Sequence, residues 1–106
     1  MKKCEFYKTM SGGYNKPPKF EKTTGYYEIL TDPAGNEITI CFEKTPRGRW
    51  NATEKTSGLL IYSSAPTRAA ALEIIREQYM DIIAAKLKTC RYVAMLADFL
   101  TMEAAQ

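Results

Sequence analysis

The sequence predicts an α+β fold, in which a three- or four-stranded antiparallel sheet is followed by one long or two C-terminal helices packed on one of its faces. Three observations lead to this prediction. Residues 26–62 alternate between polar and apolar side chains, turn-forming residues interrupt them every few positions, and the apolar period becomes helical after Pro66. With 106 residues, of which 45% are hydrophobic and 25% charged, the chain has the size and composition of one globular domain.

Residues 1–25 are predicted to be a basic arm, partly docked on a domain that spans residues 26–106. Ser11-Gly12-Gly13 and Pro17-Pro18 interrupt regular structure, and six lysines stand against two glutamates. The segment also holds four aromatic residues, which would waste apolar area in a solvated tail. Part of the arm is therefore expected to pack on the domain, and Cys4 to Tyr7 is a candidate edge strand.

Four short strands are expected next. Tyr26 to Leu30 is rich in strand formers, and the turn after it contains Pro33 and Gly35. The following run alternates strictly and places Ile38, Ile40 and Phe42 on one face. Trp50 is expected in the core, against the Leu72 and Ile75 side of the helix that follows. The expected strands are residues 26–30, 37–43, 50–54 and 59–62.

Helical spacing of apolar residues begins at Thr67, which is a suitable N-cap. An amphipathic helix is expected over residues 67–88, and a more apolar one over residues 90–103, with a break near Thr89 and Cys90. Because no glycine or proline separates them, a single helix from 68 to about 103 is the alternative.

Several kinds of site are disfavoured by the residue types present. The chain has no histidine, and its three cysteines, Cys4, Cys41 and Cys90, are widely spaced. A zinc site and a disulfide framework are therefore not expected. The lack of histidine removes the commonest general base, and no nucleotide-binding glycine motif is present. We expect no catalytic residues, metal or cofactor, and a protein that is not an enzyme.

No apolar run is long enough to span a bilayer, and the first residues are not followed by the apolar core of a signal peptide. We expect a cytoplasmic protein with no membrane partner.

Two binding surfaces are predicted. The first would contact nucleic acid through cations of the turns and the arm, which can bind phosphate oxygens. The acidic residues Glu28, Glu37 and Glu43 on the strands would repel phosphate, so contact is expected to run through the arm and the Arg47-Gly48-Arg49 turn. The candidate residues are Lys44, Arg47, Arg49, Lys55, Lys16 and Lys19.

The second predicted surface is the apolar side of the last helix, which suits a protein partner or a homodimer contact. The alternative is that this helix folds back on its own domain. The candidate interface residues are Tyr92, Met95, Leu96, Phe99 and Met102.

The runs 49–53, 57–61 and 67–72 resemble in outline the small sheet-and-helix modules of AP2-like and integrase arm-type DNA-binding domains. The features shared are a tryptophan that opens a strand, a glycine turn and a threonine-capped, alanine-rich helix. The resemblance covers about half of the chain and implies a three-stranded sheet that contacts DNA, with Arg47 and Arg49 as the residues to transfer. The short chain also resembles small proteins of phages and other mobile elements, among which inhibitors and adaptors are common.

These observations together predict a small non-catalytic binding protein. It is either associated with nucleic acid through its basic arm and turn, or a protein-binding adaptor or inhibitor that acts through its C-terminal apolar helix.

Overall fold

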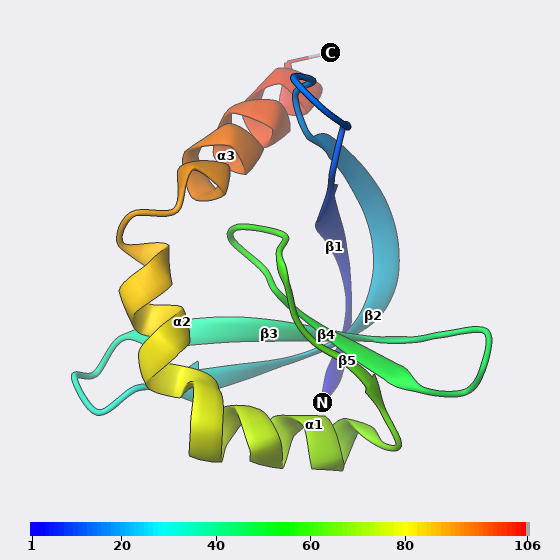
Figure 1. Cartoon of the computed structure of the whole chain (residues 1–106), viewed down its shortest axis with the longest axis vertical. Coiled ribbons are helices and arrows are strands. Elements are labelled where there is room, and N and C mark those ends of the chain that lie inside the picture. The colour runs from blue at the N-terminus through cyan, green and yellow to red at the C-terminus, as the bar shows by residue number, and fades with distance from the viewer. Residues whose placement is uncertain (106) are drawn as a thin grey trace.

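The sheet is an antiparallel meander in which the spatial order of the five strands equals their order in the chain. The computed structural model describes residues 1–105, so residue 106 of the expected domain lies outside the described part. The α+β class is confirmed, with one strand more than expected (Figure 1). The strands are β1 (Lys2–Met10), β2 (Lys19–Thr31), β3 (Glu37–Lys44), β4 (Trp50–Glu54) and β5 (Leu60–Ala65).

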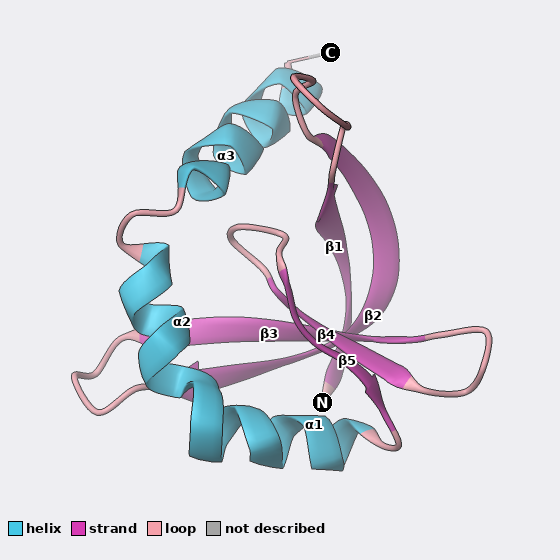
Figure 2. Ribbon diagram, viewed as in Figure 1, coloured by secondary structure: helices cyan, strands magenta, loops and turns pink. Residues whose placement is uncertain are grey.

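The helices follow the sheet and curve around one side of it (Figure 2). The expectation of two helical segments separated near Thr89 and Cys90 is confirmed, and the single long helix is wrong. The first segment carries a π-helical turn in its middle. Thr67 caps it as predicted, since its side-chain oxygen accepts a hydrogen bond from the Ala70 amide at 3.0 Å. The helical elements are α1 (Arg68–Ile74), the π turn (Ile75–Tyr79), α2 (Met80–Leu87) and α3 (Arg91–Ala104).

The segment expected to be an arm is part of the sheet instead. It forms β1 and the first half of β2, which pair from Lys2 with Tyr27 to Met10 with Lys19. The glycines and prolines between residues 11 and 18 supply the loop of this hairpin rather than ending the regular structure. The alternative of an edge strand at Cys4 to Tyr7 is confirmed, because β1 includes those residues.

Strand β2 has different partners on the two sides of Gly25. Lys19 to Tyr27 pair with β1 and Tyr26 to Thr31 pair with β3, so the two ladders overlap at Tyr26 and Tyr27. A Cβ atom on Gly25 would lie 2.1 Å from the Phe42 carbonyl oxygen, which is far inside van der Waals contact. The missing side chain therefore allows the close approach at which the β1–β2 hairpin bends away from the rest of the sheet (Figure 1).

The core lies between the sheet and α1, the π turn and α2. Ile38, Ile40 and Phe42 share the buried face as predicted, and none is more than 3% exposed. They form one cluster with Ala71, Ile75, Met80 and Ile83 from the helices. Trp50, expected in the core, is half-buried and packs against the edge of this cluster, where it also lines a surface hollow.

Helix α3 packs on the β1–β2 hairpin rather than on the main core. The Phe99 ring lies 5.4 Å from that of Tyr7 and 5.0 Å from that of Phe20, between ring centres. Leu96 is 2% exposed. The Tyr7 hydroxyl also donates a hydrogen bond to Glu103 near the end of the helix, and this bond raises the pKa of the tyrosine.

The sheet curls so that β1 reaches the turn between β4 and β5. The Thr9 amide donates to the Gly58 carbonyl at 2.8 Å, and the Thr9 hydroxyl donates to the Ser57 carbonyl at 2.5 Å. This contact joins the first strand to the far end of the meander. Within residues 1–105, no helix has the length and apolar character needed to cross a membrane.

Candidate nucleic-acid interface

A hollow of about 680 Å³ opens where β1, β2 and the β3–β4 hairpin meet. The register of the strands brings its residues together, because Lys3 pairs with Tyr26 and Lys44 pairs with Trp50. Two lysines and two aromatic residues from four strands therefore share one concave surface. The lining residues are Lys3, Cys4, Glu5, Thr24, Gly25, Tyr26, Lys44 and Trp50.

Arg68, the first residue of α1, stacks on both aromatic rings. Its guanidinium carbon lies 4.1 Å from the centre of the Tyr26 ring and 5.0 Å from that of the Trp50 ring. The two rings contact each other edge to face, with their centres 6.0 Å apart. Cation–π attraction holds the guanidinium in place. No carboxylate among residues 1–105 lies within ion-pair distance of Arg68, so its charge is uncompensated.

The charge around this hollow is positive. Its acidic lining residue, Glu5, is paired with Lys22 at 2.8 Å. Arg47 and Arg49 are exposed in the turn between Lys44 and Trp50, and neither has an acidic partner in the described part of the chain. We use the name basic corner for the cations and aromatic residues of this hollow together with Arg68 and the two arginines of the adjoining β3–β4 turn. Its members are Lys3, Tyr26, Lys44, Arg47, Arg49, Trp50 and Arg68.

The structure divides the six cations that were predicted to bind nucleic acid. Lys44, Arg47 and Arg49 belong to the basic corner. Lys55 does not, because it follows β4 whereas the arginine turn precedes β4, so the two turns lie at opposite ends of that strand. The loop with Lys16 lies at a third place, where it shares a hollow with Leu59, Arg91 and Tyr92, and Lys19 follows this loop at the start of β2. The structure therefore separates Lys55 from the arginine turn with which it was grouped as a candidate.

Glu43, one of the strand carboxylates expected to repel phosphate, is engaged in hydrogen bonds within the sheet. Its carboxylate accepts hydrogen bonds from the Lys8 ammonium at 3.1 Å and from the Thr23 hydroxyl at 2.5 Å. In strand β3 it alternates with Phe42 and Lys44, so it points to the opposite face of the sheet from the Lys44 side chain. Glu43 therefore does not weaken the positive potential of the basic corner.

Sequence reasoning missed Lys3, Tyr26 and Arg68. Lys3 was assigned to the arm, and its place beside Tyr26 follows only from the register of β1 with β2. Arg68 follows the N-cap of a helix, where nothing local indicates that its side chain reaches back over Tyr26 and Trp50. Tyr26 and Trp50 are recognisable from the sequence as strand residues, but not as members of a binding surface.

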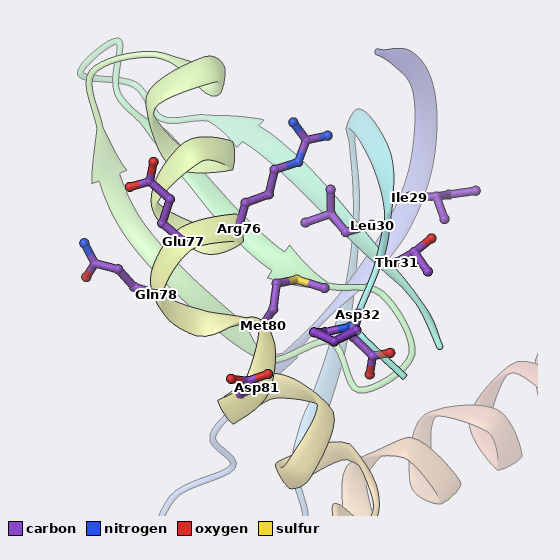
Figure 3. A pocket seen from close by; sticks show the side chains of 10 residues that line it. Ile29, Leu30, Thr31, Asp32, Arg76, Glu77, Gln78, Met80 and Asp81 are labelled. Atoms are coloured by element: carbon purple, nitrogen blue, oxygen red, sulfur yellow. The ribbon is translucent and has the colours of Figure 1, made fainter. Parts of the chain in front are cut away.

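A second hollow of about 680 Å³ lies between the end of β2 and the π turn (Figure 3). Asp32 lies at the edge of this hollow, but its carboxylate is engaged within its own turn. It accepts hydrogen bonds from the Asn36 backbone amide at 2.8 Å and from the Asn36 side chain at 3.2 Å. These bonds lower its pKa. The charged ends of Arg76 and Asp81 point apart in Figure 3, so they do not converge on a common point. Among residues 1–105, no three Cys, Asp or Glu side chains are grouped closely enough to hold a metal ion.

The predicted interface on α3 is largely used within the chain. Leu96 and Phe99 contact the β1–β2 hairpin, and Tyr92 and Met95 are half-buried. Met102 remains 66% exposed and is the one predicted interface residue that is mostly free. The alternative in which this helix folds back on its own domain is therefore confirmed.

Comparisons of the chain with protein-family models, with curated proteins and with solved structures find no match. The function of the basic corner is accordingly inferred from its own residues.

Proposed function

We propose that the chain is a small, non-catalytic nucleic-acid-binding protein that holds a single strand at the basic corner. The observation that carries this proposal is the stack of Arg68 on Tyr26 and Trp50, beside Lys3 and Lys44. Binding sites for single strands combine cations that follow the phosphates with planar groups on which bases stack. The basic corner offers both on one surface.

Phosphate contact is supported by charge. Five cations gather at the corner, and the acid in its lining is already neutralised by Lys22. Arg68 is held by the rings rather than by a carboxylate, so its N–H groups are free to donate to a phosphate. An anionic partner would relieve the repulsion among the five cations.

Base contact is supported by shape. A hollow of about 680 Å³ falls within the range that encloses small ligands. Tyr26, Trp50 and Arg68 are each half-buried, so the stack that they form is partly open to a base. The site has few groups that distinguish one base from another, so we expect weak sequence preference.

An alternative function is that of a protein-binding adaptor. A mainly apolar hollow of about 340 Å³ lies between β5 and α2 and includes Leu60, which is 57% exposed, and Ile82, which is 48% exposed. An apolar segment of a protein partner would suit this surface better than α3, which is already packed.

The test is fluorescence anisotropy with labelled random single-stranded and duplex DNA, at salt concentrations of about 50 and 200 mM. Two matched double variants each remove two exposed cations: Arg47→Ala/Arg49→Ala at the corner and Lys16→Ala/Lys19→Ala away from it. The corner variant should lower the slope of log affinity against log salt by about 1.4 for a single strand, and the distant variant should not. Arg68→Lys keeps the charge but loses the planar stack, and should weaken binding about tenfold.

Absence of binding at the lower salt concentration would overturn the nucleic-acid proposal and favour the adaptor. Equal losses in the two double variants would show that binding follows net charge and not the corner.

A further inference from the structure

Two cysteines from non-neighbouring strands face each other. Cys4 on β1 and Cys41 on β3 have their sulfur atoms 4.0 Å apart, and both are free thiols. Strand β2 lies between them, and the residue of β2 that pairs with Cys4 is Gly25. The β2 residue that pairs with Cys41 is Tyr27, so the two cysteines lie diagonally across β2. The missing side chain at Gly25 allows the close approach of β2 to the Phe42 carbonyl, and with β2 in this position the two sulfurs come within 4.0 Å of each other.

We propose that Cys4 and Cys41 form a reversible intrachain disulfide when the protein meets a low-molecular-mass disulfide. The bond requires a separation of about 2.05 Å, so the sulfurs must approach by about 2 Å. The bend at Gly25 provides this freedom, because β1 is an edge strand whose backbone, apart from its ladder to β2, is bonded at Thr9, near the end of the strand that is far from Cys4. The proposal does not depend on the function assigned to the basic corner.

The exposure of the two thiols sets the order of the steps. Cys4 is half-buried, whereas Cys41 is fully buried and its burial raises its pKa to about 12. Cys4 therefore attacks first as the thiolate, forms a mixed disulfide and releases one small thiol. The Cys41 thiol then loses its proton to solvent and attacks the Cys4 sulfur. That step forms the Cys4–Cys41 bond and expels the second small thiol, so two protein thiols are oxidised and one small disulfide is reduced.

The bond would fix the β1–β2 hairpin to the remainder of the sheet. At present β1 pairs only with β2 and touches the β4–β5 turn through Thr9. A disulfide to β3 would bridge the bend and close a long loop, which stabilises a fold by restricting the unfolded chain.

The experiment treats the folded chain with bis(2-hydroxyethyl) disulfide, alkylates the remaining thiols and measures intact mass and peptide masses. The wild-type chain should lose two hydrogen atoms and keep one alkylated thiol, Cys90. Cys90→Ser, the matched control, should form the same bond and keep none, whereas Cys4→Ser should not form it. The oxidised wild-type chain should melt about 10 °C higher, and dithiothreitol should reverse the shift.

Three alkylated thiols in the treated wild-type chain would overturn the proposal, as would a small-thiol adduct that persists on Cys4. A disulfide-linked dimer of two chains in place of the intrachain bond would overturn it as well.

Discussion

Replacement of Gly25 by alanine tests the bend that sets the β1–β2 hairpin against the sheet. The added Cβ would lie 2.1 Å from the Phe42 carbonyl oxygen and 3.1 Å from the Phe6 ring. Relief of the first contact requires β2 and β3 to separate by about 1 Å, which disturbs the pairing of Tyr26 with Phe42. Overpacking of this kind costs about 3 kcal/mol, and the lower entropy of the unfolded alanine chain returns up to about 1 kcal/mol.

The net loss of unfolding free energy is therefore about 2 kcal/mol, which corresponds to a fall of about 10 °C in melting temperature. Urea unfolding and calorimetry measure both quantities. Gly48→Ala is the control, because a Cβ at that glycine meets no atom within 4 Å and only its positive φ of 78° is unfavourable. The reasoning is refuted if Gly25→Ala is as stable as the wild type, or if it loses no more stability than Gly48→Ala.

Two further predictions concern buried carboxylates. Glu54 is 2% exposed and accepts hydrogen bonds at 2.8 Å from the amides of Thr56 and Ser57, so Glu54→Ala leaves the buried Ser57 amide unpaired. It should lower the unfolding free energy by about 2 kcal/mol in urea titrations, whereas Glu37→Ala on the surface should change it by less than about 0.5 kcal/mol. Asp32 has a pKa below its usual value of 3.8, so the bonds to Asn36 stabilise the fold above that pH and weaken as the pH falls through the folded-state pKa. The stability difference between the wild type and Asp32→Asn should stay constant above about pH 5 and shrink in more acidic solution, and a difference that grows on acidification would contradict the assigned sign.

Sequence patterns predicted the parts of the fold that neighbouring residues specify. The apolar residues Ile38, Ile40 and Phe42 alternate with more polar ones because helices cover one face of β3, and this period of two predicts the strand and its buried face. Thr67 precedes a helix and caps it with its own side chain. For both features the pattern is carried by neighbouring residues, although the helices that cover β3 come later in the chain.

The β1–β2 hairpin escaped prediction because its stability lies in cross-strand pairs. Lys22 forms an ion pair with Glu5, and Lys8 forms one with Glu21 at 3.7 Å. Lysines whose number suggests a solvated arm are therefore neutralised by glutamates on the opposite strand of the hairpin. The basic corner was only partly predicted for the same reason. Its arginine turn is visible as a turn, but the placement of Lys3 and Arg68 beside Tyr26 depends on register and on helix packing.

The equality of spatial and sequence order in the sheet has a consequence for how the chain folds. Each strand pairs with the one made just before it, so each of the four ladders closes over a short loop and little chain entropy is lost before hydrogen bonds form. Such nearest-neighbour pairing gives a low contact order for a sheet protein and favours rapid folding. The contact of Thr9 with Gly58 spans most of the meander, and we expect it to form after the ladders that bring its two ends together.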